Sequence, residues 1–309
     1  MEINRINEKW LLLRIIVPAF KEINVFSHIA KTITALGPIM VATVADKLWG
    51  WRVEVIDENN YHGGPRDKEG LPDHKTMQNE NPAAVVGLFC GLSSTMERAW
   101  QLAEFYRQQG VITVAGGWHS HYQPEESLRN GIDVVTHGDG ENIIRQLLEA
   151  ITRKESVSKI PGISFLENGQ FKTNSLTVTE APDLDNLPLP NFGLLKYAKL
   201  KTYPIGRIRG CGMRCEFCSV RGKPNWASAE HFFKTVKWLV ETRKARKFFI
   251  VDDRLEEDRQ GALDFFKLVS KQYGRALEFT VQIRLEAAKD TSLLDVMKKA
   301  GVITVCIGY

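Results

Sequence analysis

The first half of the chain alternates short apolar blocks with longer stretches whose apolar residues recur at helical spacing. Strands buried on both faces are apolar throughout, whereas a helix that covers a sheet is apolar on one side only. The blocks predict strands over residues 11–20, 51–58, 83–90, 111–117 and 133–140. The periodic stretches predict helices over residues 38–49, 95–110, 124–131 and 141–151. This alternation is typical of an α/β fold with a Rossmann-like, doubly wound parallel sheet, which we assign to residues 1–153.

The pattern changes over residues 154–200, which we interpret as a hairpin followed by a linker. Residues 162–175, GISFLENGQFKTNS, predict two short strands around a turn at Asn168 and Gly169. The proline-rich stretch 181–193, APDLDNLPLPNFG, is expected to be extended and to separate two domains.

Strand-like and helix-like segments alternate again over residues 201–309. The predicted strands are 203–210, 247–253, 277–284 and 303–309. The predicted helices are 228–245, 259–274 and 292–301, the first with Ser228 as its N-cap. Repeated βα units of this kind build parallel barrels. Because no helix follows the last apolar strand, we expect a partial, truncated barrel that holds only the first four βα units.

The composition excludes several classes of protein. The 309 residues are 43% hydrophobic and 25% charged, which suits globular domains rather than a disordered chain. No run of about 18 apolar residues predicts a membrane span, and the first residues lack the pattern of a secretory signal. The net charge of +4 is too small to indicate nucleic-acid binding, and the basic run 241–247 is expected to end an exposed helix.

The five cysteines suggest metal chemistry rather than disulfides. Their number is odd, and Cys211, Cys215 and Cys218 crowd into the stretch RGCGMRCEFCSV, so we expect a reducing, cytoplasmic location. Cys90 and Cys306 lie in apolar strands and are expected to be inert core thiols.

Thiolates are preferred ligands for iron–sulfur clusters and for zinc. A structural zinc site needs four ligands, and the next candidate downstream of the three cysteines, His231, lies inside a predicted helix. A 4Fe–4S cluster with three cysteine ligands leaves one iron open to a substrate or cofactor. The absence of a fourth nearby thiol therefore favours the cluster, with zinc as the alternative.

The stretch CGMRCEFC resembles the CxxxCxxC signature of the radical S-adenosylmethionine superfamily, with the aromatic Phe217 before its last cysteine. The resemblance implies a βα barrel, a 4Fe–4S cluster held by the three cysteines, and S-adenosylmethionine bound at the open iron. It also implies a low-potential electron donor, and a 5′-deoxyadenosyl radical that abstracts hydrogen from a substrate.

We take Phe217, Asp252 and Arg284 as candidates for contact with S-adenosylmethionine. Asp252 and Asp253 end the second predicted barrel strand, where the family places polar residues near the cofactor. Arg284 ends the third strand, and a guanidinium matches the geometry of a carboxylate. The alternative is that these residues cap strand ends or form structural ion pairs. No residue is assigned as catalytic.

The first half resembles the cobalamin-binding domain of cobalamin-dependent radical S-adenosylmethionine proteins. The matching stretches are VIDE (55–58), GLSSTMERA (91–99), AGGWH (115–119) and HGDGE (137–141). The resemblance implies that cobalamin contacts Ser93, Gly116, Gly117, Gly138 and Gly140. Paired glycines let a large planar ligand approach the backbone closely.

One motif of classical cobalamin proteins is absent. The DxHxxG sequence, which supplies an axial histidine, is replaced by PAFKEINVFSH after the first strand. Cobalt could then be bound without a histidine ligand, or the domain could be purely structural. His119 and His121 would share one face if the strand before them continued, and could touch cobalamin or a metal.

These features predict a radical S-adenosylmethionine enzyme that transfers a methyl group to an unactivated carbon or phosphorus centre of an unidentified substrate. Cyclisation or another radical rearrangement is the enzymatic alternative. The non-catalytic alternative is a corrinoid-binding module or an inactive fragment. The resemblance implies a barrel with more βα units than the four predicted here, so we expect either a fragment of a longer protein or a shortened gene product.

Overall fold

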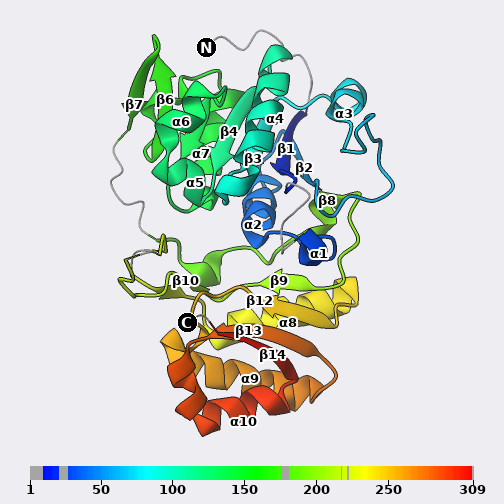
Figure 1. Cartoon of the computed structure of the whole chain (residues 1–309), viewed down its shortest axis with the longest axis vertical. Helices are drawn as coiled ribbons and strands as arrows, with labels where there is room; N and C mark the ends of the chain where they lie inside the picture. Colours follow the sequence, from blue (N-terminus) through cyan, green and yellow to red (C-terminus); the bar gives the residue numbers. More distant parts are fainter. Residues whose placement is uncertain (1–9, 21–26, 175–180, 217, 221–222, 308–309) are drawn as a thin grey trace. The chain divides into compact units, whose positions relative to one another are not determined.

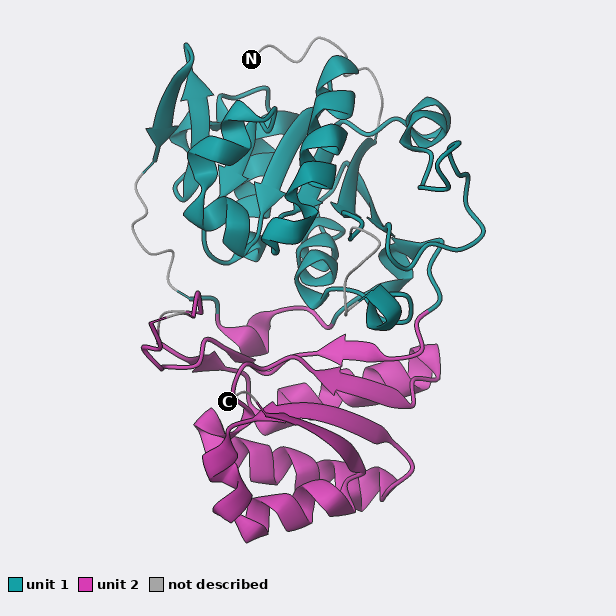
Figure 2. Cartoon of the chain, in the orientation of Figure 1, with its two compact units in different colours: residues 1–182, 190–199 teal, residues 183–189, 200–309 magenta. Residues whose placement is uncertain are grey.

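The computed structural model describes residues 10–20, 27–174, 181–216, 218–220 and 223–307. The chain divides into two compact units (Figure 2). Unit 1 comprises Met1–Pro182 and Pro190–Lys199, and unit 2 comprises Asp183–Leu189 and Leu200–Tyr309. Among the described residues, no helix combines the length and the apolar character that crossing a bilayer requires.

An eight-stranded sheet in the order β7-β6-β5-β4-β3-β1-β2-β8 forms the centre of unit 1 (Figure 1). The strands from β5 to β8 in this order run parallel, and β6 and β7 are antiparallel. Their bounds are β1 Leu11–Val17, β2 Trp51–Asp57, β3 Val85–Phe89, β4 Ile112–Gly116, β5 Val134–Thr136, β6 Ile163–Glu167, β7 Gln170–Thr173 and β8 Leu195–Lys196. The predicted Rossmann-like parallel sheet is confirmed.

Helices cover this sheet as expected for parallel strands. The helices are α1 Ser27–Ala30, α2 Leu36–Ala45, α3 His74–Glu80, α4 Met96–Gln108, α5 Trp118–Tyr122, α6 Pro124–Arg129 and α7 Gly140–Thr152. Short 3-10 turns are η1 Ser93–Thr95, η2 Val157–Lys159 and η4 Phe192–Leu194. One cluster joins the buried face of α4 to Leu12, Ile16 and Val86 of the sheet. Every residue of β1 is buried, which explains why all of them except Arg14 are apolar.

Unit 1 also departs from the sequence-based expectation. The first strand ends at Val17, and the strand predicted over residues 111–117 ends at Gly116, after which α5 begins. The short helices α1 and α3 were not predicted. The predicted hairpin is present, with positive φ at Asn168 and Gly169, and it extends the sheet beside β5. Part of the expected linker forms β8 and pairs with β2.

A buried arginine inside β1 begins a polar network through the core of unit 1. Arg14 is 1% exposed, and its Nε donates to Glu54 Oε1 over 2.6 Å. Its Nη1 donates to the Tyr106 hydroxyl over 3.2 Å, and that hydroxyl lies 2.8 Å from His74 Nδ1. A buried charge is tolerated when it is paired and hydrogen-bonded in this way.

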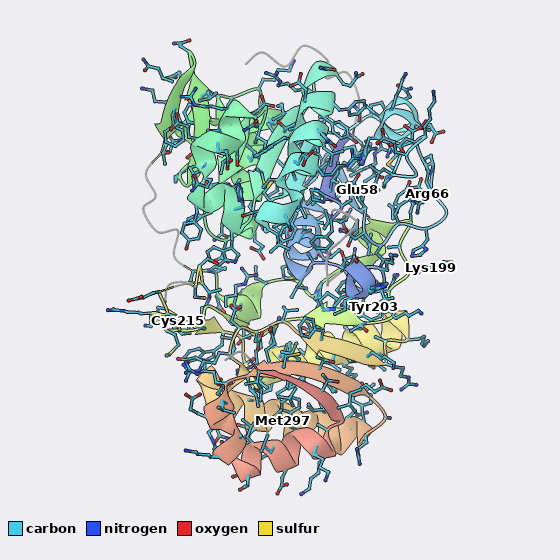
Figure 3. The ribbon with its side chains drawn as sticks, in the orientation of Figure 1. Glu58, Arg66, Lys199, Tyr203, Cys215 and Met297 are labelled. Atoms are coloured by element: carbon cyan, nitrogen blue, oxygen red, sulfur yellow. The ribbon has the colours of Figure 1, made fainter. Side chains whose placement is uncertain are left out.

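The network ends on a carboxylate at the carboxyl end of β2. Glu58 Oε1 (residue labelled in Figure 3) lies 3.0 Å from His74 Nε2 and accepts a 2.7 Å bond from Arg98 Nη2. Its Oε2 accepts from the backbone N–H of Ala19. Burial alone would raise the pKa of Glu58, but the bonds from His74 and Arg98 outweigh it and lower the pKa to about 2. Glu58 therefore stays ionised, and its bond to the N–H of Ala19 holds the backbone that follows β1.

Unit 2 contains a four-stranded parallel sheet in the order β14-β13-β12-β9, and a separate antiparallel pair, β10 and β11. Its strands are β9 Tyr203–Ile205, β10 Ile208–Arg209, β11 Asn225–Trp226, β12 Lys247–Ile250, β13 Glu278–Ile283 and β14 Val302–Ile307. Its helices are α8 Ala229–Arg243, α9 Arg259–Tyr273 and α10 Thr291–Lys299, with 3-10 turns η3 Leu184–Asn186, η5 Leu255–Asp258 and η6 Leu285–Lys289. The predicted βα alternation is thus confirmed for these four parallel strands.

Two expectations for unit 2 are wrong. Residues 203–210 do not form one strand, because the buried Arg207 leaves the sheet to pair with Asp258 over 2.6 Å. Cys306 is exposed rather than buried, because β14 lies at the edge of the sheet and most of its side chains face solvent. The expected N-cap is confirmed, since Ser228 Oγ accepts from the backbone N–H of His231.

Candidate functional site

The candidate cobalamin contacts of unit 1 gather at one edge of its sheet. Ser93 lies after β3. Gly116 is the last residue of β4, and Gly117 comes directly after it. Gly138 and Gly140 lie after β5. Strands β3, β4 and β5 are parallel neighbours, so their carboxyl ends meet at the same edge. Ligands of open α/β sheets bind at this edge.

The two glycines at the end of β4 allow close contact between loops of the protein. Gly117 has φ of 128°, and a Cβ there would lie 2.6 Å from the backbone carbon of Cys90. A Cβ on Gly116 would lie 3.0 Å from Thr136 Oγ1. The structure therefore shows that Gly117 makes room for the loop after β3, a role the sequence motif did not distinguish from approach to a ligand.

The glycines after β5 differ in their surroundings. Gly138 has φ of 77°, and a Cβ there would meet no atom within 4 Å. A Cβ on Gly140, in contrast, would lie 2.9 Å from Val41 of α2. Gly140 thus lets α7 pack against α2, and Gly138 turns the chain before α7 begins.

Replacing Gly117 by alanine is expected to lower the free energy of unfolding by at least about 2 kcal/mol, because backbone strain and the clash with Cys90 add. Gly138→Ala is the matched control. It has a positive φ but open space, so its cost should be about 1 kcal/mol. Urea denaturation of both variants measures the difference, and equal losses would contradict the close-contact role of Gly117.

His119 and His121 do not share a strand face, because they lie in α5. His119 uses both ring nitrogens: Nδ1 lies 2.9 Å from Ser93 Oγ, and Nε2 lies 2.9 Å from Glu126 Oε2. His121 turns instead toward His137, with 3.2 Å between their Nδ1 atoms. The contact of His119 with Ser93 joins α5 to the segment after β3. The contact of His121 with His137 joins α5 to the segment after β5.

The three clustered cysteines lie on the loop that follows β10 in unit 2 (Figure 3). Cys211, Cys215 and Cys218 are all half-buried, and the backbone N–H of Cys218 donates to the carbonyl of Cys215 over 3.2 Å. Phe217 lies outside the described residues. Within the described part of the chain, no three His, Cys, Asp or Glu side chains are arranged around a single metal ion. In a four-iron cluster each thiolate binds a different iron, so that chemistry does not require the sulfurs to meet at one point.

Arg254 anchors the start of this loop, a role that the sequence did not indicate. Its Nη1 donates to the carbonyl of Cys211 over 3.4 Å and pairs with Glu257 over 2.5 Å. A Cβ on Gly212 would lie 3.0 Å from Pro224 and 3.4 Å from Glu257 Oε1. The loop therefore packs against the segment that follows β12.

Asp252 is fully buried after β12 and holds the backbone between β9 and β10. Its Oδ1 accepts from the N–H groups of Arg207 and Ile208, over 2.6 and 2.9 Å. Its Oδ2 is buried and has no hydrogen-bond partner in the described structure. Burial raises the pKa of Asp252 to about 6. Asp252 thus has a structural role, and its second oxygen is buried without a donor among the described residues.

Arg284 follows β13 and is engaged by a nearby carboxylate. Its Nε and Nη2 each lie 3.1 Å from an oxygen of Glu286, and its backbone N–H donates to Glu256. The pairing with Glu286 raises the pKa of Arg284. In the structure the guanidinium of Arg284 is thus paired with a carboxylate of its own segment.

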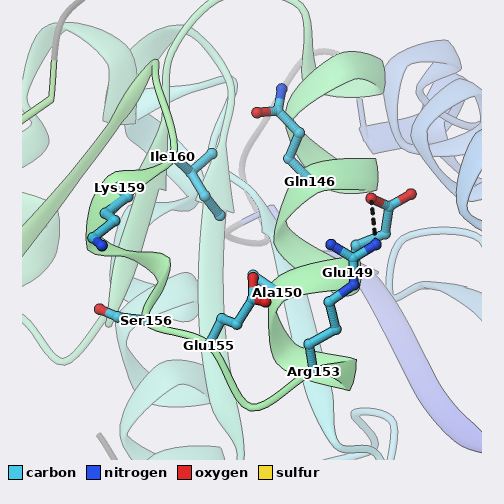
Figure 4. A pocket seen from close by; sticks show the side chains of 8 residues that line it. All are labelled: Gln146, Glu149, Ala150, Arg153, Glu155, Ser156, Lys159 and Ile160. Atoms are coloured by element: carbon cyan, nitrogen blue, oxygen red, sulfur yellow. Dashed lines mark ion pairs between the residues drawn. The ribbon is translucent and has the colours of Figure 1, made fainter.

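A cavity of about 400 Å³ lies beside the end of α7 (Figure 4). Its lining carries charges of both signs, including Glu149, Arg153, Glu155 and Lys159. Glu149 and Arg153 form an ion pair of 3.9 Å. None of the candidate cofactor residues lines this cavity, so it is separate from the sites described above.

A family model and several known proteins match this chain. A family model described as the B12 binding domain matches residues 25–148, inside unit 1. An uncharacterised methyltransferase of Pyrococcus horikoshii is 27% identical over 237 residues, which cover 72% of this chain and 51% of that protein. The anaerobic magnesium-protoporphyrin IX monomethyl ester cyclase of Synechocystis is 23% identical over 235 residues, covering 71% and 46%.

A solved structure shares the fold of nearly the whole chain. TsrM, a radical S-adenosylmethionine methyltransferase from Kitasatospora setae, aligns with a TM-score of 0.75 at 15% identity, covering 96% of this chain and 59% of TsrM. TsrM has been solved with a tryptophan substrate and an analogue of S-adenosylmethionine, and with cobalamin and a 4Fe–4S cluster. The chain described here spans about half the length of the curated relatives it matches.

Proposed function

The chain is a relative of the cobalamin-dependent radical S-adenosylmethionine proteins, and we propose that it forms the cofactor-binding part of an enzyme that transfers a methyl group. The observation that carries the proposal is the combination of two units. Unit 1 contains the match to the B12 binding domain, and unit 2 presents three half-buried cysteines in CxxxCxxC spacing after a strand.

In unit 1 we assign corrinoid binding to the carboxyl edge of the sheet. The matched residues 25–148 include the loops that follow β3, β4 and β5. Ser93, Gly116, Gly117, Gly138 and Gly140 all lie in or next to these loops. Of the glycines, Gly138 has open space beside its backbone, which suits the close approach of a large planar ligand.

In unit 2 we assign the 4Fe–4S cluster to Cys211, Cys215 and Cys218. Cysteine sulfurs are the usual ligands of iron–sulfur clusters, and these three lie on one short loop. Arg254 holds the start of that loop by donating to the carbonyl of Cys211. The donor set therefore fits a cluster.

We assign S-adenosylmethionine to the neighbouring residues of unit 2, with Phe217 as a further candidate. The carboxylate of Asp252 has an unpartnered Oδ2 that could accept a hydrogen bond from an ammonium group, but this oxygen is fully buried, so the contact requires the side chain to become uncovered. Arg284 can bind a carboxylate, provided that it exchanges Glu286 for the ligand. When bound, the cluster and S-adenosylmethionine supply a radical that abstracts hydrogen, and the corrinoid supplies a methyl donor.

The class of reaction is supported by the relatives. The Pyrococcus horikoshii relative is described as a methyltransferase, and so is TsrM, which favours methyl transfer. The Synechocystis relative is a cyclase, so radical cyclisation is the second candidate. Either reaction needs a substrate and a low-potential electron donor from outside the chain.

Anaerobic reconstitution with iron, sulfide and hydroxocobalamin tests the proposal. We expect a brown protein with the absorption of both a 4Fe–4S cluster and a corrinoid, which cleaves S-adenosylmethionine to 5′-deoxyadenosine or demethylates it when reduced. Corrinoid binding without any turnover of S-adenosylmethionine would instead identify a non-catalytic corrinoid-binding module.

A further inference from the structure

The 3-10 turn η5 connects β12 to α9 and carries three acidic residues in succession. Its first residue, Leu255, has no exposed surface, so the turn is anchored in the core of unit 2. Glu256 Oε1 accepts the backbone N–H of Arg284, which directly follows β13, over 3.1 Å. Asp258 pairs with Arg207, which lies between β9 and β10. The carboxylates of η5 therefore hold segments that belong to other strands of the sheet.

Arg254, which immediately precedes η5, extends these contacts to the loop that carries the cysteines. Its Nη1 lies 2.5 Å from Glu257 Oε2, and its Nε lies 3.5 Å from Glu256 Oε1. The same Nη1 donates to the backbone carbonyl of Cys211 over 3.4 Å. The side chain of Arg254 is only 26% exposed, so salt and solvent screen its ion pairs less than those of a surface residue. Two carboxylates of η5 thus fix the guanidinium that holds the first of the three cysteines.

A second contact joins the cysteine loop, residues 211–220, to the same turn. Gly212 has φ of 68°, and a Cβ there would lie 3.4 Å from Glu257 Oε1 and 3.0 Å from Pro224. Glu257 therefore lies beside the backbone that follows Cys211, while its other oxygen pairs with Arg254. The start of the loop is thus held from one side by η5.

The described residues of the cysteine loop belong to no helix or strand, so ladder hydrogen bonds do not order it. A loop whose ligands are ordered in advance loses less conformational entropy when it binds its metal. An arginine suits this task, because its guanidinium donates in a fixed plane and stays charged. A cation beside an iron–sulfur cluster also favours the reduced form, since reduction adds negative charge.

We propose that Arg254, held by Glu256 and Glu257, is a positioning residue that orders the start of the cysteine loop for the 4Fe–4S cluster and raises the reduction potential of that cluster. The inference rests on the proposed function, because it takes the cluster from there. Arg254 acts through the backbone of Cys211 and is not itself a ligand to iron.

Hydrogen exchange of the unloaded chain tests the ordering role without any cluster. Arg254→Gln removes the charged donor, and the backbone amides of residues 211–216 should exchange about tenfold faster, the effect expected for the loss of one hydrogen bond from a charged group. Arg259→Gln is the matched control. It removes a guanidinium that pairs with Asp290 in the same unit, and it should leave the exchange of the loop unchanged.

A double variant separates positioning of the loop from general stability. Glu257→Gln should speed the exchange of the same amides less than Arg254→Gln does, because Arg254 keeps its contact with Glu256. Combining the two substitutions should speed exchange no further than Arg254→Gln alone, since both act through one contact. Additive effects, faster exchange throughout unit 2, or unchanged exchange in Arg254→Gln would each overturn the inference and leave the proposed function standing.

The reduction potential of the reconstituted cluster is a readout that a purely structural role would not change. A redox titration followed by electron paramagnetic resonance should give a more negative potential for Arg254→Gln than for the unmodified chain. Arg254→Lys keeps the charge and should lie closer to the unmodified chain. Equal potentials in all three proteins would overturn the electrostatic part of the inference.

The failure of this inference and the failure of the proposed function are distinguishable. An unmodified chain that takes up no iron and sulfide overturns the cluster assignment of the proposed function. Hydrogen exchange of the unloaded chain still decides in that case whether Arg254 orders the loop.

Discussion

Replacing Cys215 by serine is expected to remove most of the cluster iron and to lower turnover of S-adenosylmethionine by at least about a hundredfold, because a hydroxyl is a far poorer ligand for iron than a thiolate. The same result is expected for Cys211 and Cys218, since each thiolate binds a different iron. Iron and sulfide analysis of the anaerobically reconstituted protein, together with its visible absorption, measures the loss.

Cys306→Ser is the matched control for the cysteine variants. Cys306 is exposed on the edge strand β14 and lies outside the CxxxCxxC loop, so this variant should retain full cluster content. Full iron content in all three loop variants would show that the loop cysteines do not hold a cluster. A stoichiometry of one zinc ion in the unmodified protein would point to the alternative metal.

Replacing Glu58 by glutamine is expected to lower the free energy of unfolding by about 3 kcal/mol, because it leaves the largely buried Arg98 without its charge partner. The neutral amide also makes weaker hydrogen bonds with His74 and with the backbone N–H of Ala19 than the carboxylate does. Urea denaturation at pH 7 measures the loss. Glu125→Gln, which breaks an exposed ion pair with Arg129, should change the free energy by no more than about 0.5 kcal/mol.

The pH dependence of the Glu58 variant follows from the same carboxylate. The pKa of Glu58 lies at about 2 in the folded chain, below its ordinary value of 4.5. The contribution of Glu58 to stability is therefore fully present above about pH 5 and is lost as the pH falls toward 2. The stability difference between the unmodified chain and Glu58→Gln should shrink over that range. A difference that stays constant from pH 7 to pH 3 would show that the charge of Glu58 is not what stabilises the fold.

Local sequence patterns determined the outline of this protein. Apolar blocks and helical periodicity depend on residues close together in the chain, and they predicted the parallel strands of both units. The turn at Asn168 and Gly169 was predictable for the same reason, since each of its residues must adopt a positive φ. The CxxxCxxC spacing also lies within one short loop, so the candidate cluster ligands could be identified from the sequence.

Contacts between distant residues decided the rest. Arg14 lies inside an apolar strand, and its bonds to Glu54, 40 positions away, and to Tyr106, 92 positions away, explain its burial. Arg207 lies outside the sheet because it pairs with Asp258, which is distant in the sequence. His121 contacts His137 after β5 and not its sequence neighbour His119. The sequence alone thus predicted the order of most elements and the candidate residues for metal chemistry. The tertiary structure decided which charges are buried, where strands end and which polar side chains meet, because long-range pairing leaves no periodic signal in the sequence.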